Sequence, residues 1–125
     1  ADLIIAVVGE SPYAEGQGDR GNLELNSDEI DTIRKAKTYG APVVAVLISG
    51  RPMIVEPILG DCDAFVAAWL PGSEGAGVAD ILFGDARPSG KLSMTWPRSM
   101  SQIPINLGDR DYDPLFPFGF GLKYE

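Results

Sequence analysis

The chain of 125 residues carries 18 acidic and 10 basic side chains, which gives a formal net charge of −8. This length suits a single domain, and the negative charge repels phosphate backbones and anionic lipid surfaces. We therefore expect neither a nucleic-acid partner nor a membrane partner, and no apolar run reaches the roughly 20 residues that a membrane-spanning helix needs.

The usage of histidine and cysteine excludes further classes of chemistry. No histidine is present, which removes Ser-His-Asp and Cys-His nucleophile systems and His-based zinc sites. The single cysteine, Cys62, has no internal disulfide partner and is expected to be a small buried residue. Asp109, Asp111 and Asp113 have the alternating spacing of a calcium loop but lack its glycine and terminal glutamate. We expect no metal site and no cofactor.

The first elements form a predicted βαβ unit. Residues 3–8 are apolar without polar alternation, which is typical of a strand covered on both faces in a parallel sheet. Asn26 and Glu29 have the spacing of a capping box, which predicts a helix that ends at Gly40. A second apolar run, residues 43–48, predicts the next buried strand.

The following segment repeats this design on a smaller scale. Residues 53–59 predict one or two helical turns, because Pro57 limits a longer helix. Residues 64–69 predict a third strand, and Ser73 is the expected N-cap of a helix that ends at Gly84.

The last third of the chain departs from this pattern. Residues 91–96 alternate polar and apolar side chains, which predicts an edge strand. Residues 97–125, rich in proline, glycine and aspartate, are expected to wrap the domain or to pack on a neighbour. Strands that alternate with helices predict an α/β fold, here a three-layer α/β/α sandwich with a mainly parallel sheet and an edge strand.

Charged side chains follow the predicted strands at the edge where parallel sheets bind their ligands. Glu10, Glu15 and Asp19 come after the first strand, and Arg51 follows the second, where it is placed to pair with a carboxylate. The three carboxylates are either solvated loop charges or include a catalytic acid. Tyr13 supplies an apolar wall that would raise the pKa of a nearby carboxyl, as a general acid needs.

Other patterns at this edge have simple structural explanations. Residues 16–21 match G-x-G-x-x-G, but Pro12 and its neighbours separate them from the strand and the acidic side chains repel a pyrophosphate, so we expect no nucleotide site. Trp69 and Trp96 lie within predicted strands and are expected in the core rather than as sugar-stacking platforms. Residues 71–75 are either a helix cap or a contact to a substrate or another domain.

Four blocks, in order, resemble the C-terminal α/β sandwich domain of glycoside hydrolase family 3, the β-glucosidase and exo-β-glucanase group. They are GESPYAE (9–15), VLISGRP (46–52), AAWLPGSEG (67–75) and PLFPFGFGL (114–122). The resemblance spans residues 1–125 and implies a partial (α/β)6-type sandwich domain. The chain starts without Met on an apolar run, so we expect an N-terminally truncated fragment that lacks the family's N-terminal (β/α)8 barrel.

The resemblance implies a catalytic role for Glu15. It would be the general acid/base of a retaining β-glucosidase or exo-β-glucanase, facing a nucleophilic Asp on the barrel of the parent chain. Glu10, Asp19 and Arg20 would only support the loop. The implied substrate is a β-glucan or β-glucoside, the implied location is secreted or periplasmic, and the fragment alone would be inactive. The alternative is a noncatalytic carbohydrate-binding or domain-interaction module.

Overall fold

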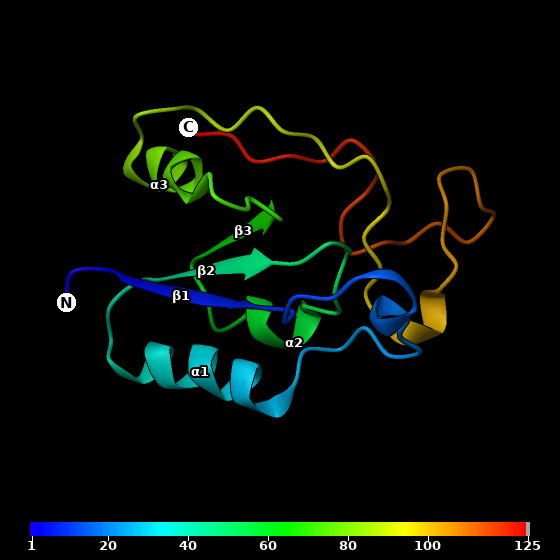
Figure 1. Cartoon of the computed structure of the whole chain (residues 1–125), viewed down its shortest axis with the longest axis horizontal. Helices are drawn as coiled ribbons and strands as arrows, with labels where there is room; N and C mark the ends of the chain where they lie inside the picture. Colours follow the sequence, from blue (N-terminus) through cyan, green and yellow to red (C-terminus); the bar gives the residue numbers. More distant parts are fainter. Residues whose placement is uncertain (125) are drawn as a thin grey trace.

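The computed structural model describes residues 1–124 and contains a three-stranded parallel sheet (Figure 1). The strands are β1 (Ile4–Gly9), β2 (Val43–Ile48) and β3 (Ala64–Trp69), and β2 lies between the other two. The predicted second and third strands are confirmed residue for residue, and the first is confirmed with a shift of one residue at each end. Parallel strands joined by helices confirm the predicted α/β fold.

Helices lie on both sides of the sheet, as Figure 1 shows. On one side are α1 (Ser27–Thr38) and the short α2 (Glu56–Leu59), and on the other is α3 (Gly75–Phe83). Two 3-10 turns complete the fold, η1 (Glu15–Gly18) and η2 (Met100–Gln102). Within residues 1–124, none of the helices combines the length and apolar character required to cross a membrane.

The ends of α1 are those that the sequence predicts. The Asn26 side chain accepts a hydrogen bond from the Glu29 backbone N–H at 3.0 Å, and the Glu29 carboxylate accepts one from the Asn26 N–H at 2.8 Å. This reciprocal capping box pairs two N–H groups that the helix itself leaves unpaired. Gly40 follows the helix with φ +76°, a left-handed conformation that glycine adopts without steric cost.

The core forms where β2 packs against α1, α2 and the segment that contains Trp96. Trp96, with 1% of its surface exposed, lies at the centre of this contact and donates its indole N–H to the Met53 carbonyl at 2.8 Å. Its ring packs edge-on against Phe65 and Phe116 at centroid distances of 6.0 and 6.2 Å. The prediction that Trp96 is a core residue is confirmed. Other fully buried side chains are Ile33, Val43, Ala45, Leu47, Val55 and Ile58.

Strand β1 differs from its prediction, because only one of its faces is covered. Ala6 and Val8 are buried, whereas Ile5 and Val7 are 41% and 60% exposed. The side chains of a strand alternate between its faces, and α1 packs against β1 on the face of Ala6 and Val8, whereas the face of Ile5 and Val7 is largely exposed. The apolar run therefore predicts the strand correctly but not its exposure.

The predicted edge strand over residues 91–96 is wrong. This segment does not join the parallel sheet; it forms a single antiparallel bridge, between Trp96 and Phe116. Leu92 also exchanges backbone hydrogen bonds with the C-terminal tail, residues 97–124. Its N–H donates to the Phe120 carbonyl at 2.8 Å, and its carbonyl accepts from the Gly119 N–H at 2.9 Å. The burial of Trp96 against β3 and the stacking of Phe116 on Phe120 hold the segment and the tail together instead.

The predicted cap of α3 is also wrong. Ser73 donates its hydroxyl to the Glu74 carboxylate at 2.9 Å rather than capping the helix, which begins at Gly75. The reason is a turn that precedes the helix, in which the Glu74 N–H binds the Pro71 carbonyl at 2.9 Å. The other end agrees with the prediction, since Gly84 follows α3 with φ +83°.

Candidate functional site

The three parallel strands end at one edge of the sheet, and backbone hydrogen bonds join the loops that follow them. The Glu10 N–H donates to the Ile48 carbonyl at 3.0 Å, and the Ser49 N–H donates to the Trp69 carbonyl at 3.2 Å. The loop after β1 is thereby tied to β2, and the loop after β2 is tied to β3. Side chains that the chain supplies far apart in sequence are brought together here, as expected for the carboxyl end of a parallel sheet.

Gly9 marks the point where β1 enters the site. Its φ is +153°, and a Cβ atom at this position would lie 1.9 Å from the Ile48 carbonyl oxygen. No side chain fits there without moving the backbone of β2. The close approach of the two strands therefore requires glycine at residue 9.

Glu10 is the buried carboxylate of the site. Only 3% of its side chain is exposed, and its Oε1 atom lies 3.1 Å from Nη1 of Arg20 and 3.2 Å from Nε of Arg51. Two guanidinium groups offset the cost of taking this charge out of water. The predicted pairing of Arg51 with a carboxylate at the edge is confirmed, and the contact between Glu10 and Arg20 joins the two ends of the loop.

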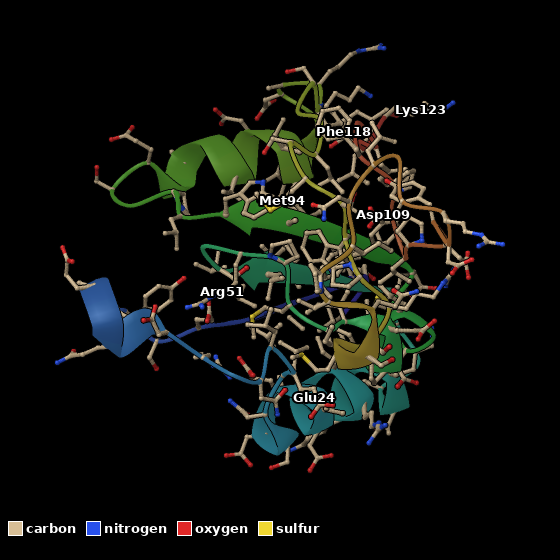
Figure 2. All side chains as sticks on the ribbon, turned by 90° about the vertical axis from the view of Figure 1, so that its right-hand side faces the viewer. Glu24, Arg51, Met94, Asp109, Phe118 and Lys123 are labelled. Atoms are coloured by element: carbon tan, nitrogen blue, oxygen red, sulfur yellow. The ribbon has the colours of Figure 1, made fainter. Side chains whose placement is uncertain are left out.

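Arg51 makes two further contacts with the loop that follows β1. Its Nη2 donates to the Gly18 carbonyl at 2.7 Å, and its Cζ lies 4.5 Å from the centroid of the Tyr13 ring. Burial lowers the pKa of Arg51, but the contact with Tyr13 and the charge of Glu10 outweigh it and raise the pKa above its ordinary value. In Figure 2 Arg51 lies between the sheet and the segment that contains η1. The Arg51 side chain is therefore positively charged and held in place by these contacts.

Tyr13 fills the space between two glycines. A Cβ atom on Gly18 would lie 2.4 Å from Cδ2 of the Tyr13 ring, and one on Gly50 would lie 2.5 Å from its hydroxyl oxygen. The sequence gives no signal for this packing, because it depends on how two loops meet. The predicted effect of Tyr13 on the pKa of a carboxyl stays a prediction.

Glu15 opens the 3-10 turn η1 on the outer side of this loop. Its φ of +51° lies in the left-handed region, which is rare for a residue with a side chain and is found disproportionately at functional sites. The side chain is exposed, and its carboxylate has no hydrogen-bond or ion-pair partner among residues 1–124. Its oxygen atoms are available to a ligand or to another surface. Asp19, at the end of η1, is also exposed.

Trp69 is the second non-glycine residue in the left-handed region, with φ +56°. It ends β3 at the register shift between β2 and β3, and its ring lies 6.0 Å from that of Trp96. The side chain is partly buried and packed against the hydrophobic core, as predicted. Trp69 lies where β3 leaves the sheet, and Glu15 lies in the loop that follows β1, so both left-handed residues belong to the end of the sheet where the strands terminate.

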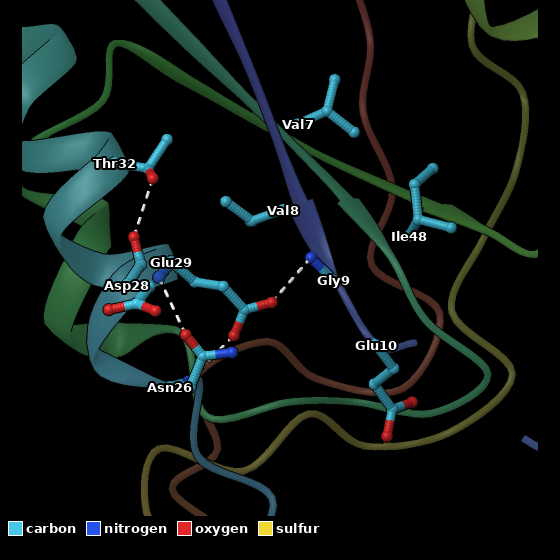
Figure 3. Close-up of a pocket in the computed structure, with 9 residues that line it drawn as sticks. All are labelled: Val7, Val8, Gly9, Glu10, Asn26, Asp28, Glu29, Thr32 and Ile48. Atoms are coloured by element: carbon cyan, nitrogen blue, oxygen red, sulfur yellow. Dashed lines mark hydrogen bonds between the residues drawn. The ribbon is translucent and has the colours of Figure 1, made fainter. Parts of the chain in front are cut away.

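A hollow of about 460 Å³ separates the end of β1 from the start of α1, and Figure 3 shows the residues that line it. One oxygen of Glu29 accepts the Asn26 N–H, and the other accepts the Gly9 N–H at 2.9 Å. The capping box predicts the first of these bonds but not the second, which depends on the packing of α1 against β1. Within residues 1–124 no group of three or more histidine, cysteine, aspartate or glutamate side chains is placed to hold a metal ion.

Comparisons with known proteins show which family the chain is similar to. Residues 1–124 match the family model described as "Glycosyl hydrolase family 3 C-terminal domain". The chain is 38% identical to the periplasmic beta-glucosidase of Salmonella typhimurium and 36% identical to a beta-xylosidase of Formosa agariphila. Each alignment covers 99% of this chain and 19% of the relative, so the chain spans about a fifth of the length of these proteins.

Solved structures show the same relationship. The exo-1,3/1,4-beta-glucanase of a Pseudoalteromonas species superposes with a TM-score of 0.92 at 47% identity, over 99% of this chain and 17% of the glucanase. The beta-glucosidase of Listeria innocua superposes with a TM-score of 0.87 at 33% identity, over 98% of this chain and 20% of the enzyme. The chain therefore belongs to the C-terminal domain family of the family 3 glycoside hydrolases.

Proposed function

We propose that this chain provides the general acid/base, Glu15, of a retaining glycosidase that acts on β-glucosides or closely related β-glycosides. The names of its relatives support this reaction class, since they include beta-glucosidases, a beta-xylosidase and an exo-glucanase. The observation that supports Glu15 is its free, exposed carboxylate on a left-handed residue at the ligand-binding edge of the sheet. The nucleophilic carboxylate comes from an N-terminal (β/α)8 barrel of the same parent protein.

The reaction requires Glu15 in two protonation states. The protonated carboxyl donates its proton to the glycosidic oxygen while the nucleophilic carboxylate attacks the anomeric carbon, so the alcohol leaves and a glycosyl ester forms. The Glu15 carboxylate then takes a proton from water as the water oxygen attacks the same carbon and releases the nucleophile. The sugar leaves with its original anomeric configuration.

The geometry of a retaining enzyme constrains how this edge meets the barrel. Its two carboxyl groups lie about 5–5.5 Å apart, so the barrel has to approach the exposed side of η1 closely. Glu15 is exposed there, whereas Glu10 is buried and held by two arginines. Of these two carboxylates, only Glu15 is able to reach a sugar bound by another domain.

Replacing Glu15 with Gln in the full-length protein tests the proposal. Turnover of glycosides with poor leaving groups should fall by about 10²–10⁴-fold, whereas aryl glycosides with good leaving groups, which need little protonation, should lose much less in the glycosylation step. Added azide attacks the glycosyl ester without a general base, so it should accelerate the variant and yield a β-glycosyl azide. The matched control is Glu24→Gln, which removes the same charge from an exposed side chain and should leave turnover unchanged.

Equal losses on both kinds of substrate, with no azide product, would remove Glu15 from this role. The alternative, a noncatalytic carbohydrate-binding module, is tested by calorimetric titration of the chain alone with gluco-oligosaccharides. The enzymatic proposal expects no measurable heat of binding, because most sugar contacts come from the barrel. Saturable binding with a defined stoichiometry would support the binding module.

We further propose a secreted or periplasmic location for the parent protein. The support is the relative from Salmonella typhimurium, whose name places it in the periplasm. Fractionation of cells that express the parent gene, followed by detection of the protein in each fraction, tests this location. Recovery of the protein in the cytoplasmic fraction would contradict it.

A further inference from the structure

Three partners of the Arg51 guanidinium bracket Glu15 in the sequence. Its Nε lies 3.2 Å from the carboxylate of Glu10, its Nη2 donates to the Gly18 carbonyl at 2.7 Å, and its Cζ lies 4.5 Å from the centroid of Tyr13. Glu10 and Tyr13 precede Glu15, and Gly18 follows it. One side chain from the loop after β2 therefore holds both arms of the loop that carries Glu15.

The combination of these three contacts suits a planar, forked cation. The guanidinium donates in two directions at once while its face lies over an aromatic ring, which the compact ammonium of lysine does not reproduce. The Glu10 carboxylate is 3% exposed, so losing one of its two arginine partners leaves a buried charge undercompensated.

The ring of Tyr13 is held from two more directions. The backbones of Gly18 and Gly50 approach it so closely that a Cβ atom on either would overlap the ring or its hydroxyl, at 2.4 and 2.5 Å. Tyr13 lies only two residues before Glu15, so its packing restricts the chain near Glu15. The ring packs between the loop after β1 and the loop after β2.

Arg51 is itself attached to the sheet. The hydroxyl of the buried Ser49 donates to the Arg51 carbonyl at 2.7 Å, and the Ser49 N–H donates to the Trp69 carbonyl at 3.2 Å. The position of Arg51 thus follows from β2 and β3, the most regular part of the molecule. Contacts that start from rigid strands define a side chain more accurately than contacts within a loop.

Glu15 needs such support because its backbone is in an unfavourable conformation. A φ of +51° is unfavourable for a residue with a side chain, and this conformation persists only when the surrounding structure enforces it. The exposed carboxylate of Glu15 makes no hydrogen bond or ion pair, among residues 1–124, that would do so. We infer that Arg51 is a positioning residue for Glu15, acting through Glu10, Gly18 and Tyr13. This inference rests on the proposed acid/base function of Glu15.

Kinetics of Arg51→Lys and Arg51→Ala in the full-length protein test the inference. A displaced acid loses most where protonation matters most, so kcat on substrates with poor leaving groups should fall about 10–100-fold. The kcat on activated aryl glycosides should change by less than a factor of about 3, and KM should change little on either. A merely structural role would instead lower the amount of folded enzyme and reduce the activity on both kinds of substrate by the same factor.

A second pair of variants leaves Arg51 in place. Gly18→Ala pushes a methyl group into the Tyr13 ring, whereas Gly21→Ala meets nothing within 4 Å. Gly18→Ala should reproduce the leaving-group dependence of Arg51→Lys, and Gly21→Ala should behave as the unaltered protein. Uniform losses for Arg51→Lys and Gly18→Ala, or no loss in either, would overturn the inference.

The same data separate this inference from the proposed function. If Glu15→Gln shows the leaving-group dependence and azide acceleration while the Arg51 and Gly18 variants do not, the acid/base role stands and positioning by Arg51 is wrong. If Glu15→Gln shows neither effect, the proposed function fails first, and the inference about Arg51 fails with it.

Discussion

At the scale of single residues, Trp96 is the largest fully buried side chain within residues 1–124. It packs against Phe65 and Phe116 and donates its indole N–H to the carbonyl of Met53. Phenylalanine at this position would retain an aromatic ring but lose volume and the donor. The Met53 carbonyl would then be left without this partner in a buried environment.

We therefore expect Trp96→Phe to lower the free energy of unfolding of this domain by about 2–4 kcal/mol. Native-state hydrogen exchange of the β2 amides, followed by mass spectrometry on the full-length protein, measures this loss. The control is Phe118→Leu, a change at an exposed ring that should shift the value by less than about 0.5 kcal/mol. Equal exchange rates in the two variants would contradict the prediction.

Asp63 makes the stability of the domain depend on pH. The Val43 N–H donates to its carboxylate at 2.9 Å and the Lys37 ammonium lies 3.2 Å away, and both hold the pKa of Asp63 below its usual range. A carboxyl whose pKa is lower in the folded state stabilises that state above its unfolded pKa, about 3.9. This contribution is lost as the pH falls through the lower, folded pKa.

Comparing Asp63→Asn with the unaltered protein should show this dependence. The variant should melt at a lower temperature than the unaltered protein between pH 5 and 7, about equally at both ends of the range. The two melting temperatures should converge as the pH approaches about 2. Asp111→Asn, at an exposed carboxylate, is the control. A difference for Asp63→Asn that persists to the lowest pH would show that the loss is steric rather than electrostatic.

The environment of Asp63 also affects the neighbouring thiol. Cys62 is partly rather than fully buried, in contrast to its prediction, and its thiol lies 3.6 Å from the Leu59 carbonyl. Burial, followed by the negative charges of Asp63 and Asp61, raises the pKa of the Cys62 thiol. The thiol is therefore protonated near neutral pH and a weak nucleophile.

At the scale of elements, the start of α1 is the best-defined local feature of the chain. Replacing Asn26 with Ala removes the acceptor of the Glu29 N–H and should destabilise the domain by about 1 kcal/mol. The control is Ser27→Ala, one residue further into the helix, which should have a much smaller effect. Hydrogen exchange of the backbone amides in the first turn of α1 measures the effect of each substitution. Equal protection of these amides in the two variants would contradict the expectation.

The elements also show what the sequence alone predicts and what it does not. Uninterrupted apolar runs locate the strands, and the Asn26–Glu29 spacing locates the helix start, because these signals are local. The exposure of Val7 is not local, since it depends on which elements cover the face of β1. Residues 91–96 alternate as a strand does, yet they pair with the tail, because Trp96 is buried in the core.

The same distinction applies to the candidate site. The charge of Arg51 and its place after β2 predict a partner among the carboxylates, and Glu10 is that partner. The sequence does not predict that Gly18 and Gly50 enclose Tyr13, because glycines have many uses and only the meeting of two loops reveals this one. The packing of these two loops is thus the part of the site that local sequence patterns do not predict.

At the scale of the whole molecule, the uncovered face of β1 has a consequence for the chain studied alone. Ile5 and Val7 present apolar surface, and within residues 1–124 β1 pairs only with β2, so its other edge is free. Exposed apolar strand edges promote association between copies. We expect the isolated chain to self-associate, and Val7→Lys to reduce this association.

Sedimentation velocity over a range of concentrations measures the effect, with far-ultraviolet circular dichroism to verify that the variants keep the same secondary structure. Thr38→Lys is the matched control, because it adds the same charge at an exposed position on α1. If both lysine variants lower association equally, the surface of β1 is not the surface through which the copies associate.

The Glu29 carboxylate also connects the two ends of the loop between β1 and α1. Its two oxygens accept hydrogen bonds from the N–H groups of Gly9 and Asn26, the residues at the two ends of the loop that carries Glu15 (Figure 3). One side chain therefore joins both ends of the loop, in addition to the contacts that Arg51 makes with Glu10 and Gly18. Insertions near Gly21, where the backbone faces open space, would alter what the loop presents to a substrate while the scaffold keeps its shape. The loop that would meet a substrate is thus distinct from the strands and helices that keep the domain folded.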